Sequence, residues 1–210
     1  MASDVSAAEI AGTDGRVLRA RGHRTRARLL AAGAEVIAAK GLHAARVDDI
    51  VKAARSSHGT FYLYFSSKED LFEELVTEVA GEVRALVAEL PMVSDTEKGR
   101  AGLRAWLERF ADLYEARGSI IRAWTEAELT GEVAGHQGEA VLGDLVGTLA
   151  TRLRLPRRAG LDPGIAALAL DTMVEGRNYY ANTRQLQATR DELLDVLVAI
   201  FGAALFGRDA

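Results

Sequence analysis

The chain has 210 residues, 49% of them hydrophobic and 27% charged, and its formal net charge is −4. This balance is typical of a globular protein and excludes a chain that is disordered or fibrous throughout, while the absence of cysteine excludes disulfides and thiolate metal sites. As a whole-chain figure the negative charge argues against a nucleic-acid-binding protein. The charge is unevenly distributed, however. Residues 1–68 hold 11 Lys and Arg against 6 Asp and Glu, a net of +5, whereas residues 69–210 hold 15 against 24, a net of −9.

The first 22 residues show no hydrophobic periodicity, which predicts a disordered basic arm over 1–22. They lack the basic start and apolar run of a signal peptide. The longest apolar run, 196–207, is shorter than the about 20 residues that a membrane-spanning helix needs. We therefore expect a cytoplasmic protein with no membrane partner. A basic cluster begins in the arm, and either it is a solvated tail or it follows the minor groove or backbone of DNA. Its members are Arg16, Arg19, Arg21, Arg24, Arg26 and Arg28.

Three helices are predicted in the basic part of the chain. A helix over 24–40 stops at Gly41, where a left-handed cap fits. A short second helix follows from apolar residues at i, i+3, i+4 and i+7, which are Val47, Ile50, Val51 and Ala54. After a break at 55–57, an aromatic-rich segment over 58–65 forms the third.

Longer helices are predicted in the remainder. Overlapping capping boxes at Ser66 and Ser67 start a long helix that ends before Pro91. Further helices are expected over about 94–118, 120–129, 141–155, 163–182 and 190–206, with capping boxes at Ser94 and Thr189. Because no period-2 alternation is present, the fold class is all-α with about nine helices.

Residues 46–68 carry the functional signal. Two short helices joined by a tight break and followed by a long helix form a helix-turn-helix, whose second helix presents its N-terminal side chains to the DNA major groove. His58 and Thr60 can bond base edges. The hydroxyls of Tyr62 and Tyr64 and the charge of Lys68 can reach phosphates.

Residues 53–71, AARSSHGTFYLYFSSKEDL, resemble the DNA-binding signature of TetR-family transcriptional regulators. The resemblance covers 24–71 and implies a helix-turn-helix DNA-binding domain over 23–68 and a helical effector-binding and dimerisation domain over 69–210. Phe61 and Phe65 match buried positions of the family. The resemblance also implies which residues contact bases or phosphates. The family's contact positions are occupied here by Val47, Ser57, His58, Gly59, Thr60, Tyr62, Tyr64 and Lys68.

Three positions depart from the family's pattern. Arg46 stands where a Thr usually caps the second helix, and Arg55 and Ser56 stand where Gly and an apolar residue usually form the turn. A non-glycine residue in a left-handed turn costs about 1–2 kcal/mol, and a lost cap costs about 1 kcal/mol. Either the helix-turn-helix is less stable than those of its relatives, or the turn differs in shape. We add the hypothesis that Arg46 and Arg55 compensate by contacting phosphate.

The later helices hold candidates for an effector pocket, since such pockets are mostly apolar with a few polar anchors. The candidates are Trp106, Phe110, Tyr114, Trp124, Glu126, Glu128, Met173, Arg177, Asn178 and Tyr180. An equal case exists that the aromatic residues are plain core and the polar ones are solvated.

The resemblance implies a homodimer through the helices over 163–182 and 190–206, and a repressor that a small, largely apolar effector releases from a palindromic double-stranded operator. The alternative is a helical ligand-binding dimer that has lost specific DNA binding. No catalytic, metal-ligand or phosphate-cradling motif is present, so we expect neither enzyme activity nor a cofactor.

Overall fold

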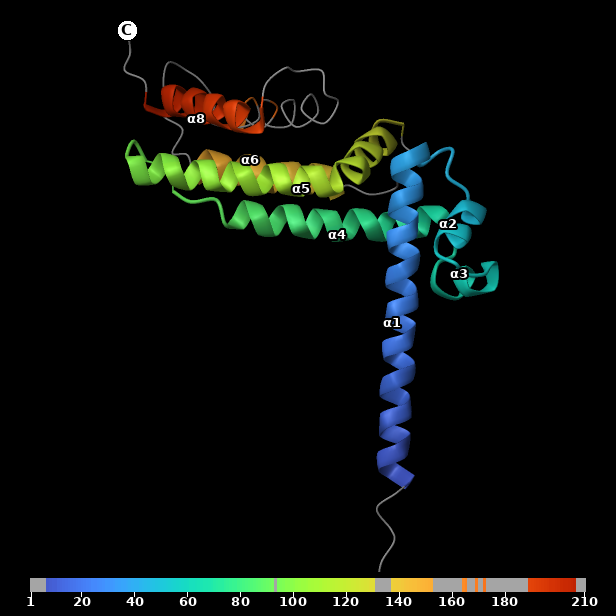
Figure 1. The fold of residues 1–210 in the computed structure, drawn as a ribbon. Coiled ribbons are helices and arrows are strands. Elements are labelled where there is room, and N and C mark those ends of the chain that lie inside the picture. The colour runs from blue at the N-terminus through green and yellow to red at the C-terminus, as the bar shows by residue number, and fades with distance from the viewer. Residues whose placement is uncertain are drawn as a thin grey trace, which may run out of the picture. The chain divides into compact units, whose positions relative to one another are not determined.

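The computed structural model describes residues 7–92, 94–130, 137–152 and 189–206, together with 164, 165, 169 and 172 (Figure 1). This part of the chain holds helices and no strand, which confirms the all-α prediction. None of its helices is long and apolar enough to cross a membrane. The helices are α1 (Ala7–Lys40), α2 (Val47–Ala53), α3 (His58–Tyr64), α4 (Lys68–Ala88), α5 (Glu97–Thr130), α6 (Gln137–Arg152) and α8 (Arg190–Phe206).

Seven helices lie within the described ranges, compared with about nine expected. The predicted break at Gly118 is wrong, because α5 runs through it unbroken. A glycine inside a helix costs only about 1 kcal/mol relative to alanine, so packing can carry the helix past it. The predicted helix over 163–182 lies almost entirely outside the described residues.

The prediction of a disordered arm is wrong for residues 7–22, because α1 begins at Ala7. This segment is rich in Ala and Arg, two residues of high helix propensity. A helix can therefore extend beyond its packed part without the apolar stripe on which the prediction depended.

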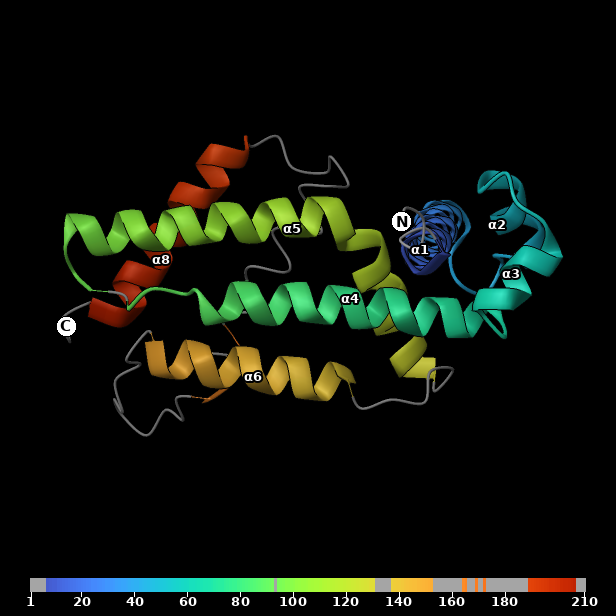
Figure 2. The ribbon, with the colours of Figure 1, turned by 90° about the horizontal axis from the view of Figure 1, so that it is seen from below.

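The chain divides into two compact units, Met1–Val76 and Thr77–Ala210. The boundary falls inside α4, later than the expected boundary between residues 68 and 69. In the first unit, α2 packs against both α1 and α3 (Figure 2). Phe61 and Phe65 are 0% and 2% exposed, as their resemblance to buried family positions implies. At Gly33 a Cβ would overlap the side chain of Leu71, so the glycine permits the close approach of α1 and α4.

The second unit is built on α5, which contacts α6 and α8. The indole Nε1 of Trp106 donates to the backbone oxygen of Leu86 at 2.8 Å and ties α5 to α4. Arg190 joins α8 to α5 through the carboxylate of Asp112 at 2.5 Å and the backbone oxygen of Glu108 at 2.8 Å. The buried face of α8 consists of Leu194, Leu197 and Phe201.

Candidate nucleic-acid interface

The turn between α2 and α3 contains a strained residue. Arg55 has a φ of +47°, in the left-handed region that favours glycine. The turn is closed by the amide of Ser56, which donates to the backbone oxygen of Val51 at 2.8 Å. The expectation of a non-glycine residue in a left-handed turn is therefore confirmed.

The start of α2 lacks a side-chain cap, as the replacement of threonine by Arg46 predicts. Asp48 and Asp49 lie in its first turn, where the helix dipole favours negative charge. Lys40 at the end of α1 contacts Asp49 at 2.8 Å, and this hydrogen bond lowers the pKa of the Asp49 carboxyl. Electrostatic contacts thus stabilise the helix end in place of the cap.

The start of α3 is capped by Ser57. The Ser57 Oγ accepts from the Thr60 amide at 3.2 Å and lies 3.0 Å from the Thr60 Oγ1. This bonding holds both side chains in defined rotamers at the end of α3 that would enter a groove. Two of the expected contacts are therefore preorganised by each other.

His58, the first residue of α3, is paired with α2. Its Nε2 lies 2.6 Å from the Asp48 Oδ1, which orients the ring. His58 and its neighbour Gly59 are exposed, and so are Arg46 and Tyr62; Val47, Thr60 and Tyr64 are half-buried. The exposed residues present polar groups and backbone to solvent at the α2–α3 surface.

Lys68 has a contact that the sequence did not predict. Its Nζ donates to the backbone oxygens of Leu42, His43 and Ala45 at 2.9, 3.0 and 3.0 Å. All three ammonium protons therefore serve the connection between α1 and α2. A phosphate contact by Lys68 stays a prediction, and it would require exchanging one of these bonds.

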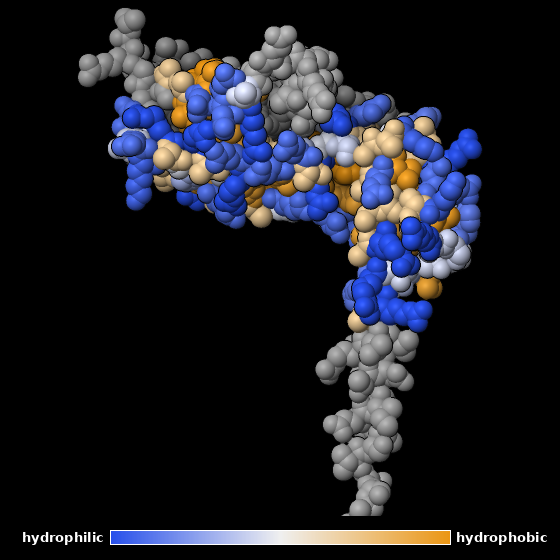
Figure 3. All heavy atoms as spheres, viewed as in Figure 1, coloured by the Kyte–Doolittle hydropathy of each residue, from blue (hydrophilic) through white to orange (hydrophobic). Residues whose placement is uncertain are grey.

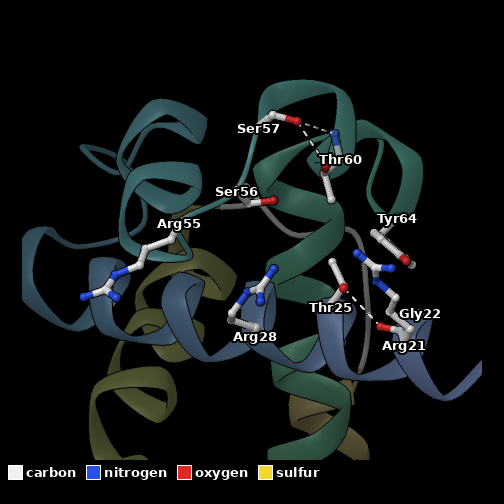
Figure 4. A pocket seen from close by; sticks show the side chains of 9 residues that line it. All are labelled: Arg21, Gly22, Thr25, Arg28, Arg55, Ser56, Ser57, Thr60 and Tyr64. Carbon is white, nitrogen blue, oxygen red and sulfur yellow. Dashed lines mark hydrogen bonds between the residues drawn. The ribbon is translucent and has the colours of Figure 1, made fainter.

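A hollow of about 500 Å³ lies between α1, the turn and α3 (Figure 4). It is lined by three arginines, five hydroxyl-bearing residues and one glycine: Arg21, Arg28, Arg55, Thr25, Ser56, Ser57, Thr60, Tyr64 and Gly22. In Figure 3, strongly hydrophilic residues gather over the part of α1 next to α3. Arg21 and Arg28 belong to the basic cluster, for which a path along DNA was one of two expectations, but the sequence did not indicate that they meet Thr25 at one hollow. Their i, i+4, i+7 spacing, which puts them on one face of a helix, was the available signal.

The expected aromatic effector residues on α5 are buried, whereas Glu126 on the same helix is exposed. Trp106, Phe110, Tyr114 and Trp124 are 4–7% exposed, and the rings of Trp106 and Phe110 lie 5.4 Å apart. Their lining of an effector cavity stays a prediction. The side chains of Glu128, Met173, Arg177, Asn178 and Tyr180 lie outside the described part. Within that part, no three metal-ligating side chains gather.

Residues 29–75 match the family model described as "Bacterial regulatory proteins, tetR family", and this segment includes α2, the turn, α3 and the start of α4. In this segment the chain is similar to TetR-family regulatory proteins. The TetR-family match covers the helix-turn-helix rather than the helices that follow it.

The curated proteins to which this chain is similar are transcriptional regulators. The HTH-type transcriptional regulator YdgC of Bacillus subtilis is 42% identical over 73 residues, 35% of this chain and 37% of YdgC. The fatty acid metabolism regulator protein of the same organism is 43% identical over 54 residues and is covered to 28%. These alignments span about a third of the relatives' length. The HTH-type transcriptional regulator EthR of Mycobacterium tuberculosis is 26% identical over 205 residues, covering 92% of this chain and 93% of EthR.

Solved structures show the same fold along most of the chain. A TetR family transcription regulator from Marinobacter aquaeolei VT8 superposes with a TM-score of 0.65 at 20% identity, covering 89% of this chain and 98% of its own. Reduced NemR of E. coli superposes with a TM-score of 0.62 at 20% identity, covering 88% and 100%. The fold similarity therefore extends beyond the helix-turn-helix.

Proposed function

We propose that this chain is a cytoplasmic, homodimeric transcriptional repressor that binds a palindromic operator through α3 and is released by a small, largely apolar effector. The observation that carries the proposal is the exposed N-terminal end of α3, where His58 and Thr60 are held by Asp48 and Ser57. Preorganised polar side chains at this position suit base-edge recognition in the major groove. Tyr62 and Tyr64 add hydroxyls for phosphate oxygens.

Apolar residues on more than one side of α8 support dimerisation. Leu194, Leu197 and Phe201 face the interior, whereas Val196 and Ile200 on the same helix are 55% and 40% exposed. A helix that is apolar around most of its circumference is normally buried on more than one side. A second copy of α8 would cover the exposed residues and provide the second helix-turn-helix that a palindromic operator requires.

The effector would bind near the buried aromatic residues of α5. Both tryptophans of the chain, Trp106 and Trp124, are there. Intrinsic tryptophan fluorescence therefore reports binding at the proposed position without added label. Apolar compounds that quench or shift this emission saturably, and also release DNA, are the expected effectors.

Operator binding is tested by selecting duplexes from a random library with the full chain and measuring fluorescence anisotropy against a scrambled duplex. We expect a palindromic consensus, specific binding at moderate salt, and loss of binding in His58→Ala. His23→Ala is the matched control, since His23 is an exposed histidine of α1 outside the α2–α3 surface. Selection of no consensus at low salt would refute the proposal.

The strain at Arg55 and the uncapped start of α2 favour one alternative, a helical ligand-binding dimer without specific DNA binding. The same selection separates the two functions. Saturable tryptophan quenching without a selected duplex would establish the alternative.

A further inference from the structure

The hollow between α1 and α3 is lined by arginines whose side chains make no polar contact that would stabilise the described part of the fold. Within the described part of the chain, the side chains of Arg21, Arg28 and Arg55 form no hydrogen bond or ion pair. By contrast Arg26, on the same helix, pairs with Glu74 and lies 5.5 Å from the centre of the Phe65 ring. The lining arginines therefore keep their hydrogen-bonding capacity for another group.

The chemistry of the lining is that of an anion site. No acidic residue lines the hollow, and its hydroxyls come from Thr25, Ser56, Ser57, Thr60 and Tyr64. Guanidinium groups bind phosphate oxygens with two parallel hydrogen bonds, which makes arginine well suited to this ligand. Hydroxyls add shorter-range donors to the same oxygens.

The arginines of the hollow are directed differently. Figure 4 shows Arg21 and Arg28 reaching from α1 toward α3, whereas the guanidinium of Arg55 extends away from both. The Tyr64 hydroxyl overhangs α1, since a Cβ added at Gly22 would lie 3.5 Å from it. Arg21, Arg28 and Tyr64 therefore form the centre of the site, and Arg55 contributes charge at its margin.

We propose that the hollow binds a phosphate group of the operator backbone, held by Arg21 and Arg28 of α1 and by the Tyr64 hydroxyl of α3. This inference rests on the proposed operator binding. It makes α1 part of the DNA interface and assigns to Arg21 and Arg28 a positional role that is independent of base sequence.

The charge test compares Arg21→Ala, Arg28→Ala and the double variant with Arg24→Ala. Arg24 is the matched control, because it lies on the same helix but outside the lining, and its Nε bonds the Ala20 oxygen of its own helix at 3.3 Å. The dissociation constant for the selected duplex is measured across a range of KCl concentrations. Loss of one phosphate contact lowers the slope of log K against log salt by about 1, so the double variant should lose about 1 and each single variant up to that amount. Equal slopes for Arg28→Ala and Arg24→Ala would overturn the site.

A steric test blocks the hollow without changing charge. Gly22→Ala is expected to bind DNA normally, because its Cβ meets only an ordinary 3.5 Å contact. Gly22→Leu places a larger side chain at the lining and should weaken binding severalfold, with equal effect on cognate and scrambled duplexes. Thermal unfolding verifies that both variants fold. If Gly22→Leu binds like Gly22→Ala, the site is refuted; if the wild type selects no duplex, the proposed function fails instead.

Discussion

Arginines serve different purposes in the two units. In the second unit, Arg84 pairs with Asp144 at 3.1 Å and Arg117 pairs with Glu82 at 2.6 Å, so cations join helices to one another. In the first unit, the arginines around the hollow have no side-chain partner among the described residues. The comparison teaches that the fold of the first unit does not use the charges of the arginines around the hollow, although it does use Arg26, Lys40 and Lys68. The charges around the hollow are available to a polyanion.

The largest expected effect separates packing from contact within α3. Phe61→Ala removes a fully buried ring and should lower the free energy of unfolding by about 3–5 kcal/mol, with loss of DNA binding. Tyr62→Phe removes only a hydroxyl from a residue that is 55% exposed. It should weaken DNA binding at unchanged stability. Chemical denaturation and anisotropy check both variants, and a stability loss in Tyr62→Phe would contradict the division.

A smaller effect is expected at the strained turn. Arg55→Gly relieves the left-handed conformation and should raise the free energy of unfolding by about 1 kcal/mol, after allowing for the greater freedom of glycine in the unfolded chain. Arg55→Ala removes the same charge but keeps the strain, so it should not stabilise. Denaturation curves that coincide for the two variants would show that the turn stores no strain.

The ion pairs of the second unit test the other half of the comparison, namely that arginines there stabilise the fold and do not bind DNA. Arg117→Met breaks the contacts with Glu82, which raise the pKa of the guanidinium. Because both side chains are 37% exposed, solvent screening should limit the loss of stability to below about 1 kcal/mol. The salt slope of DNA binding should not change. A reduced slope would mean that arginines outside the first unit also contribute to the interface.

The smallest effect concerns pH. The amide and hydroxyl of Thr189 donate to the Glu192 carboxylate at 2.7 and 2.8 Å, and they lower the pKa of Glu192 below its usual 4.5. A lowered folded-state pKa means that this contribution is present above pH 4.5 and disappears as the pH falls through the lowered value. The stability advantage of wild type over Glu192→Ala should therefore be larger at pH 7 than at acidic pH, and it should shrink as the pH falls below 4.5. An advantage that is independent of pH from 7 down into the acid range would contradict the assignment.

Local sequence signals predicted the local structure well. The capping box of Thr189 with Glu192 depends on residues close in sequence, whereas the left-handed turn at Arg55 and the burial of Phe61 were expected from the resemblance to TetR-family regulators. The predicted cap at Ser94 is an exception, because the Gly99 amide bonds the hydroxyl of Thr96 instead. Neighbouring hydroxyls offer the same chemistry, and only the backbone conformation selects between them.

Contacts between distant segments were not predictable in the same way. The three bonds of Lys68 reach back to the loop after α1, and no pattern in the intervening sequence specifies them. The hollow likewise depends on how α1 packs beside α3. Arg21 and Arg28 seemed no different from other members of the basic cluster until their surroundings were known.

The bonding of Lys68 has a consequence for which substitutions position 68 tolerates. Three carbonyl oxygens converge on one nitrogen at 2.9–3.0 Å. A compact ammonium with three tetrahedral donors fits this arrangement, whereas the flat fork of a guanidinium does not. Arginine at position 68 would keep the positive charge but could not donate from one nitrogen to all three carbonyl oxygens. The exchange of lysine for arginine is therefore not conservative here. We therefore expect position 68 to tolerate only lysine as long as the loop after α1 keeps its conformation.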